Sequence, residues 1–150
     1  MRGLIVDSNL LLLYTIGTFD TRMIPTFKRT AKYSAEDFQR VAWLVNICGD
    51  ILTTPSILTE VSNLSTKPAG RLRVPYFQSF AVHIRGMRER LVSSTLTINI
   101  DSFAQFGFSD AAIHEFSSKG HLVLTDDLQL AVYLASRNIE VINFNHLRAA

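Results

Sequence analysis

Short apolar runs and longer amphipathic segments alternate along the whole of this chain, and this alternation restricts its fold more than any other feature. The runs predicted as strands are residues 4–6, 50–53, 95–100, 122–124 and 141–144. The segments predicted as helices are residues 9–16, 34–49, 55–66, 74–91, 110 onward and 128–136. Such alternation is typical of α/β proteins, in which helices cover a mainly parallel sheet. A chain of 150 residues is the size of one domain, so we expect a single three-layer α/β/α domain over residues 1–150.

The ends of several predicted helices follow from local chemistry. Ser34 followed by Asp37 resembles a capping box with Asp in place of Glu. Thr54 is a suitable N-cap because the proline after it fits the first helical position. Gly17 is expected to close the first helix, and residues 18–33 are expected to form a loop or an irregular excursion.

The composition predicts a soluble protein of the cytoplasm. No apolar run approaches the roughly 20 residues that a membrane span needs, and the N-terminal residues lack the features of a signal peptide. The lone cysteine, Cys48, excludes an internal disulfide and fits a reducing compartment, with a buried apolar position as its simplest interpretation. We therefore expect no membrane association.

Five acidic residues stand where predicted strands end or within the predicted helices that follow: Asp7, Glu60, Asp110, Asp126 and Asp127. Asp110 is expected to begin a helix that Ser109 caps. Ligands of parallel sheets bind outside the carboxyl ends of the strands. Carboxylates gathered at that rim can form an oxygen-rich site for hard divalent cations.

Each of these acids also has a simpler interpretation. Asp7 and one member of the pair 126–127 suit N-caps of the helices that follow them. Asp110 suits an ordinary first helical turn, and an exposed position is the default for Glu60. A metal site has the advantage that it explains the acids together.

The net charge of +2 does not by itself indicate a nucleic-acid partner. If the acids gather in one cleft, however, the remaining surface is more basic than the total implies. Lys28, Arg29 and Lys32 form one basic cluster and are candidates for contacts with a polyanion. The alternative is that such clusters are only solvated faces.

Other kinds of site find less support. The four histidines show no zinc spacing, and no Ser-His-Asp or Cys-His arrangement or glycine-rich phosphate loop stands out. Trp43 and the ten phenylalanines fit core positions better than a base-stacking platform. The exception is Phe103, Phe106 and Phe108, because one of these aromatic rings can lie beside the cleft and stack on a base.

The acidic motifs resemble those of the PIN-domain family of metal-dependent nucleases. The first family motif is a strand ending in Asp, a hydroxyl residue and Asn, matched by Leu4–Asn9. The second is a Glu on the helix after the second strand, matched by Glu60. The third is an Asp opening a helix, matched by Asp110, and the fourth is a strand ending in Thr, any residue and Asp, matched by Thr125–Asp127. The resemblance covers nearly the whole chain.

The resemblance implies hydrolysis of RNA phosphodiester bonds with one or two Mg²⁺ or Mn²⁺ ions, leaving a 5′-phosphate and a 3′-hydroxyl. The implied metal ligands and catalytic residues are Asp7, Glu60, Asp110 and Asp127, with Asp126 left open as an alternative fourth ligand. The implied supporting residues, which would orient water or hydrogen-bond to the acids, are Ser8, Asn9 and Thr125.

The same resemblance implies partners and alternatives. A catalytic domain of this size is similar to the toxin component of bacterial toxin–antitoxin pairs, in which an antitoxin or other inhibitory protein occludes the cleft. A homodimer is a further expectation. A PIN-like RNA-binding or assembly scaffold without activity and a DNA-directed nuclease of the same architecture remain the alternative functions.

Overall fold

In the computed structural model, which describes residues 2–66 and 70–149, the strands form one sheet in which every neighbouring pair is parallel. The strand order is β3-β2-β1-β4-β5. The strands are β1 (Leu4–Val6), β2 (Ile51–Thr53), β3 (Arg88–Glu89), β4 (Leu122–Thr125) and β5 (Val141–Asn143). β1 lies at the centre of the sheet, and all three of its residues are buried, as expected for a parallel strand covered on both faces.

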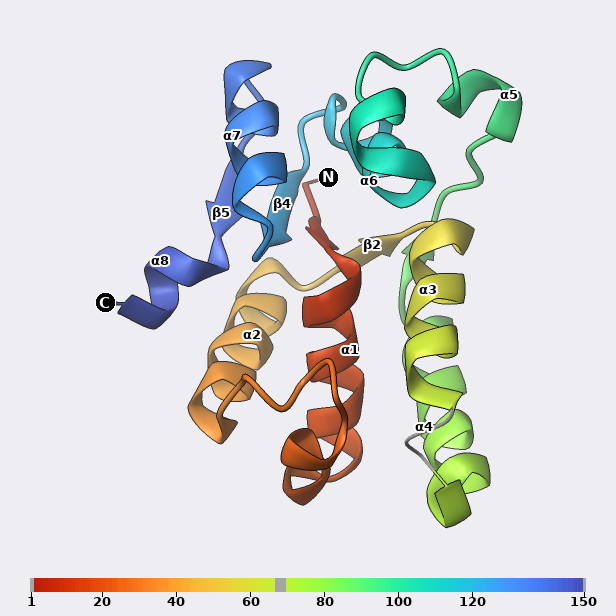
Figure 1. Cartoon of the computed structure of the whole chain (residues 1–150), viewed down its shortest axis with the longest axis vertical. Coiled ribbons are helices and arrows are strands. Elements are labelled where there is room, and N and C mark those ends of the chain that lie inside the picture. The colour runs from red at the N-terminus through yellow and green to blue at the C-terminus, as the bar shows by residue number, and fades with distance from the viewer. Residues whose placement is uncertain (1, 67–69, 150) are drawn as a thin grey trace.

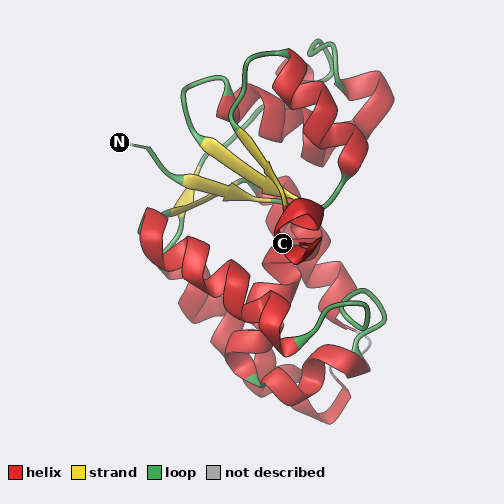
Figure 2. Ribbon diagram, turned by 90° about the vertical axis from the view of Figure 1, so that its left-hand side faces the viewer, coloured by secondary structure: helices red, strands yellow, loops and turns green. Residues whose placement is uncertain are grey.

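Helices lie on both sides of this sheet (Figure 1, Figure 2). The helical segments are α1 (Ser8–Phe19), η1 (Thr21–Thr26), α2 (Ala35–Cys48), α3 (Pro55–Thr66), η2 (Gly70–Leu72), α4 (Arg73–Arg85), α5 (Ser94–Thr97), α6 (Phe103–Ser117), α7 (Leu128–Ser136) and α8 (Phe144–Ala149). α1 packs against α2, α3 and α4 in one layer, and α6 packs against α7 in the other. The predicted three-layer α/β/α fold with a parallel sheet is confirmed.

α1 passes through the middle of its layer, surrounded by other elements. Leu10, Leu11, Leu12 and Leu13 are all fully buried, although four successive residues point in all directions around a helix. The contacts of α1 with η1, α2, α3, α4 and β4 account for this burial. A helix that is apolar all round is stable only in such a position.

The predicted caps of α2 and α3 are confirmed. The Ser34 hydroxyl accepts a hydrogen bond from the Asp37 N–H at 3.1 Å, and the Asp37 carboxylate accepts one from the Ser34 N–H at 2.9 Å. The Thr54 hydroxyl accepts a hydrogen bond from the Ile57 N–H at 3.3 Å. Each bond satisfies an amide that has no partner within its own helix.

The prediction that Gly17 closes the first helix is wrong. α1 continues through Gly17 to Phe19, and Phe38 of α2 packs directly on the glycine. A Cβ atom at residue 17 would lie 2.2 Å from Cδ1 of Phe38. Gly17 is therefore required for the close approach of two helices, not for a helix end.

The predicted strand at residues 95–100 is also wrong. This segment contains α5 and turns, and the Thr97 hydroxyl and N–H both donate to the Ser93 carbonyl oxygen, each at 2.9 Å. Such local bonds from hydroxyl residues compete with a strand ladder. The outer strand on that side of the sheet is instead β3, because α4 ends at Arg85 rather than near residue 91. The last strand is one residue shorter than predicted, since Phe144 begins α8.

Residues 20–33 form an ordered excursion rather than an open loop (Figure 1). Ile24 and Phe27 are buried against the core, and the buried Thr30 hydroxyl donates to the Ile24 carbonyl oxygen at 2.7 Å. These contacts fix the path of the chain up to Tyr33, which lies at the carboxyl end of the sheet beside Asp126.

Two further predictions concern α2 and the membrane. Trp43 is 62% exposed on α2, so its predicted core position is wrong, while Cys48 at the end of α2 is partly buried. None of the helices in the described ranges is long and apolar enough to cross a bilayer.

Candidate metal centre

The sheet has a topological switch point between β1 and β4. The chain moves from β1 to β2 in one direction along the sheet and from β4 to β5 in the other. Crevices form outside the carboxyl ends of the strands at such a point. Asp7 follows β1, and Asp126 and Asp127 follow β4, so three of the predicted acids lie at the switch point.

Asp7 is held rigidly at this point. Its carboxylate accepts one hydrogen bond from the Ser8 N–H at 2.7 Å and another from the Thr125 hydroxyl at 2.6 Å. The pKa of Asp7 is raised to about 6, mainly by burial and to a smaller extent by the charges of Asp126 and Glu60, while the two hydrogen bonds act to lower it. Asp7 therefore caps α1, as its simpler interpretation predicts, and also ties β1 to β4 at the crevice.

Asp110 is the most strongly perturbed of the acids. Burial raises its pKa to about 8, with further contributions from the charges of Asp7, Asp127 and Glu60. In the described part of the chain no hydrogen bond to its carboxylate is found. The acids that raise the pKa of Asp110 belong to three other segments of the chain, so charges from four segments act on one region.

Ser109 does not cap a helix, contrary to the prediction. α6 begins at Phe103 and is interrupted at Gly107, where φ is 84°, so Ser109 already lies inside a helical turn. Its hydroxyl donates to Glu60 Oε2 at 3.0 Å. This bond joins α6 to α3 and places the exposed Glu60 beside Asp110.

The two aspartates after β4 have different partners. Asp127 caps α7 through a hydrogen bond from the Leu130 N–H at 3.0 Å, and its side chain is exposed. Asp126 accepts a hydrogen bond from the Tyr33 hydroxyl and forms an ion pair with Lys32 at 3.2 Å. Burial and the bond to Asp126 raise the pKa of Tyr33, so its phenol stays protonated. The charge of Asp126 is thus already balanced within the protein.

The ion pair with Asp126 separates Lys32 from the other two members of the predicted basic cluster. Lys32 lies against Asp126, whereas Lys28 and Arg29 are exposed in the turns between η1 and α2. Tyr33 was not predicted as a site residue. An aromatic residue at the end of an irregular segment, 93 positions before its partner, carries no signal that sequence reasoning can detect.

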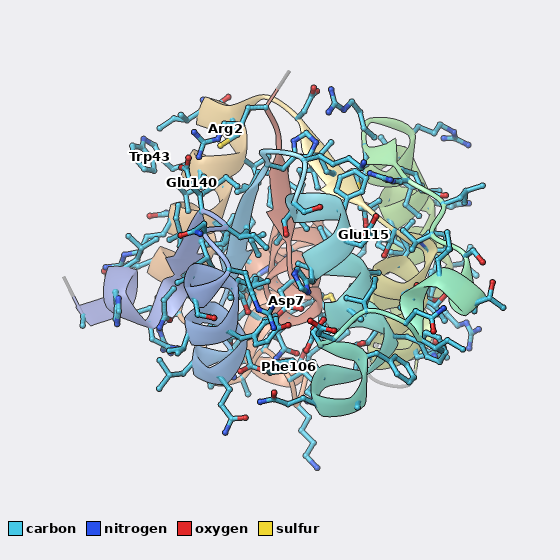
Figure 3. The ribbon with its side chains drawn as sticks, turned by 90° about the horizontal axis from the view of Figure 1, so that it is seen from above. Arg2, Asp7, Trp43, Phe106, Glu115 and Glu140 are labelled. Atoms are coloured by element: carbon cyan, nitrogen blue, oxygen red, sulfur yellow. The ribbon has the colours of Figure 1, made fainter. Side chains whose placement is uncertain are left out.

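The donor types suit a hard divalent cation, because carboxylate and hydroxyl oxygens are its preferred ligands. Seen from above (Figure 3), Asp7 lies near the middle of the molecule, between α6 and α7. The Ser8 hydroxyl is buried and has no hydrogen-bond partner in the described part of the chain. Asn9 follows it, partly buried, in the first turn of α1. A polar ligand at this place would satisfy an otherwise unpaired buried group.

The side chains are not, however, arranged as a ready metal cage. Within residues 2–66 and 70–149, no three or more histidine, cysteine, aspartate or glutamate side chains are grouped so that they could hold a metal ion. Asp7, Glu60 and Asp127 instead accept hydrogen bonds from the protein. A cation would have to draw these carboxylates closer together, in exchange for some of those bonds.

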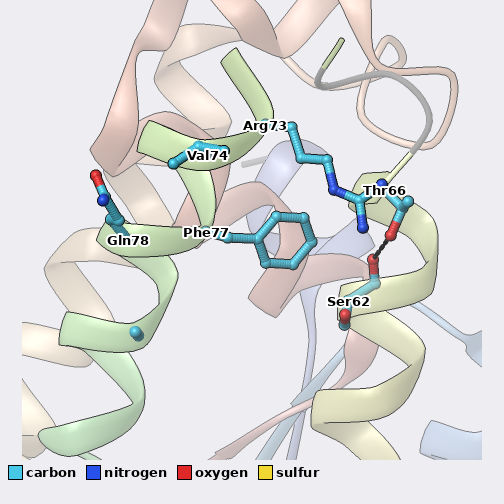
Figure 4. Close-up of a pocket in the computed structure, with 7 residues that line it drawn as sticks. Ser62, Thr66, Arg73, Val74, Phe77 and Gln78 are labelled. Carbon is cyan, nitrogen blue, oxygen red and sulfur yellow. Dashed lines mark hydrogen bonds between the residues drawn. The ribbon is translucent and has the colours of Figure 1, made fainter. Parts of the chain in front are cut away.

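Two hollows lie on α3. One, of about 520 Å³, adjoins Glu60 and is lined by residues of α3, α5 and α6 that include Phe108. The other, of about 450 Å³, lies between α3 and α4, where Phe77 points toward Ser62 and Thr66 and Arg73 lies over its ring (Figure 4). None of the five predicted acids lines this second hollow.

No protein family model matches the chain, and no curated protein is significantly similar to it in sequence.

Proposed function

We propose that this protein is a PIN-like endoribonuclease that uses Mg²⁺ or Mn²⁺ to hydrolyse RNA. The observation that carries the proposal is the convergence of acids at the switch point of a parallel sheet, where the charges of Asp7, Glu60 and Asp127 all raise the pKa of Asp110. Carboxylates that raise one another's pKa in a crevice are relieved by a bound cation. The oxygen-only donor set favours magnesium or manganese over zinc.

In this proposal Asp7, Asp110 and Asp127 hold the cation, with Glu60 near a second position. A divalent cation supplies Lewis-acid activation of water and of the scissile phosphate at such a site. The Thr125 hydroxyl keeps Asp7 oriented toward the crevice. Water adds to phosphorus, the bond from phosphorus to the 3′-oxygen breaks, and that oxygen takes up a proton as it leaves.

The wider setting of the proposal follows from the resemblance to the PIN family. In that setting the protein acts in the cytoplasm as a toxin, forms a homodimer, and is inhibited by an antitoxin or other protein that covers the crevice. Growth arrest on expression of the chain, relieved by Asp7→Asn, is the expected cellular result.

The first test is cleavage of end-labelled RNA and single-stranded DNA pools in Mn²⁺, Mg²⁺ or EDTA. We expect metal-dependent cleavage of RNA, and Asp110→Asn should reduce it at least about 100-fold, since even the outer partners of metal ligands matter to that extent. Glu115→Gln is the matched control, because Glu115 lies on the same helix and is not among the acids that perturb Asp7 or Asp110 (Figure 3). Cleavage that survives Asp110→Asn would refute the assigned site.

One observation favours the scaffold alternative, namely that the described side chains are not already grouped around a metal position. Melting curves with added Mn²⁺ separate the two functions. A nuclease site that binds Mn²⁺ gains stability by mass action, and Asp110→Asn should abolish that gain. A scaffold would show the same melting temperature with and without Mn²⁺. The DNA arm of the cleavage assay decides between RNA and DNA as substrate.

A further inference from the structure

The hollow beside Glu60 combines an aromatic ring with a polar wall. α3 contributes Ser56, Thr59 and Asn63 to its lining, and α6 contributes Phe108. Glu60 lines the same hollow and also raises the pKa of both Asp7 and Asp110. Ser109, the neighbour of Asp110 in sequence, also lines this hollow and donates to Glu60. The hollow therefore lies beside the candidate metal centre, and we call it the Phe108 groove.

Phe108 is held on one side and open on the other. Its ring packs edge-on against Phe103, with the ring centroids 4.9 Å apart and an angle of 65° between the planes. The side chain nevertheless remains 46% exposed. Phe106, by contrast, is partly buried and packs on Tyr133 at 5.3 Å. The interruption of α6 at Gly107 stands between these two phenylalanines, so that only Phe108 lines the groove.

We propose that the Phe108 groove binds an unpaired nucleobase of the substrate strand, stacked on Phe108 and hydrogen-bonded at its edge by α3. A base has an apolar face and a polar edge, which match the ring of Phe108 and the amide and hydroxyls of α3. A phosphate matches poorly, because Glu60 is the one charged side chain among the residues that line the groove. A base within a duplex cannot stack there, so the strand must be single at this point.

This inference rests on the proposed function for the identity of the strand, but it is tested by binding rather than by cleavage. Trp43 is the only tryptophan and lies exposed on α2, which is in a different part of the layer from α3 (Figure 1). The triple variant Trp43→Phe, Phe108→Trp, Asp110→Asn therefore carries one reporter in the groove and cannot use the proposed site for cleavage. The probe is a random-sequence single-stranded RNA pool, with and without Mn²⁺.

The expected result is saturable quenching of the groove tryptophan by single-stranded RNA but not by duplex RNA. The Asp110→Asn variant that retains Trp43 is the matched control, and its fluorescence should not change. Phe108→Ala and Phe108→Leu should weaken binding by roughly 5- to 100-fold, as expected for loss of base stacking. Phe108→Trp should retain saturable binding because it keeps an aromatic ring, and Trp43→Phe, which lies outside the groove, should bind as the parent. Phe108→Leu keeps an apolar side chain against Phe103, so loss of binding in a folded Phe108→Leu protein reports the ring itself.

The outcomes for the groove and for the nuclease are distinct. Quenching and Phe108-dependent binding without any cleavage by the wild type would uphold the groove and refute the nuclease. Asp110-dependent cleavage with unchanged binding of Phe108→Ala and Phe108→Leu would uphold the nuclease and overturn the groove. Absence of quenching by single-stranded RNA would also overturn the proposal that the Phe108 groove binds a base.

Discussion

At the scale of single residues, Asp126 and Asp127 are adjacent in sequence but differ in how their charge is balanced. The Asp126 side chain is 7% exposed and is already bound by the Lys32 ammonium group and the Tyr33 hydroxyl. Asp127 is exposed, and one of its carboxylate oxygens accepts a hydrogen bond from a backbone N–H of α7. We expect Asp127→Asn to weaken Mn²⁺ binding at least about 10-fold and Asp126→Asn to change it less than about 3-fold, because affinity follows the charge of the ligands. Calorimetric titration of each variant measures the difference.

Lys32→Ala provides the matched control for this pair. Removing the ammonium group leaves Asp126 as an unbalanced negative charge near Asp7, so Mn²⁺ binding should tighten. Equal loss of affinity in Asp126→Asn and Asp127→Asn would show instead that both carboxylates ligate the metal.

At the scale of secondary-structure elements, the contact between α1 and α2 depends on Gly17. Gly17→Ala would gain about 1 kcal/mol of helix propensity, but the new methyl group would overlap Phe38. Overpacking typically costs about 1–3 kcal/mol, so we expect a net loss of stability in urea unfolding. Gly86→Ala is the control, since φ at Gly86 is −87° and the nearest atom to an added Cβ is 3.5 Å away. Phe38→Ala removes every overlapping atom, so a smaller loss of stability from Gly17→Ala in the Phe38→Ala background than in the wild type would identify the overlap as the cause.

The elements that were predictable from sequence are those whose limits are set by neighbouring residues. α2 begins at the capping box of Ser34, α3 at Thr54, and α7 covers the predicted residues 128–136. Gly17 was misjudged because its role depends on Phe38, which is distant in sequence and carries no local signal. Residues 95–100 alternate as a strand does, but a strand needs a partner, and the place beside β2 is taken by β3.

The candidate site was predictable to a similar degree. The positions of Asp7 and the 126–127 pair follow from strand ends, which local apolar runs define. The bond between Thr125 and Asp7 joins residues 118 positions apart, and it was expected only through the family resemblance. The partners of Asp126 and the bond from Ser109 to Glu60 depend on packing between segments, which sequence patterns do not encode.

At the scale of the whole molecule, the buried acids make stability depend on pH. In the folded protein the pKa of Asp7 is raised to about 6 and that of Asp110 to about 8. The folded state therefore binds more protons than the unfolded state between about pH 4 and pH 8, and the free energy of unfolding falls as pH rises through this range. We expect a decrease on the order of a few kcal/mol in metal-free buffer, measured by urea unfolding at successive pH values.

Asp110→Asn tests the source of this pH dependence. An amide does not titrate, so the decrease between about pH 6 and pH 8 should largely disappear in the variant, while the part due to Asp7 remains. Stability that is constant from about pH 4 to pH 8 in the wild type would mean that neither carboxyl group is perturbed as described.

The Arg148 guanidinium of α8 donates to the Lys32 carbonyl oxygen at 2.9 Å and pairs with Asp37 at 3.1 Å, and Asn145 donates to the Asp126 carbonyl oxygen at 2.8 Å. During synthesis on the ribosome, the segment that carries Lys32 and Tyr33 emerges long before these residues of α8. The full set of bonds that holds this segment beside Asp126 therefore forms only after α8 has been synthesised. Completion of the acidic crevice therefore follows the synthesis of α8.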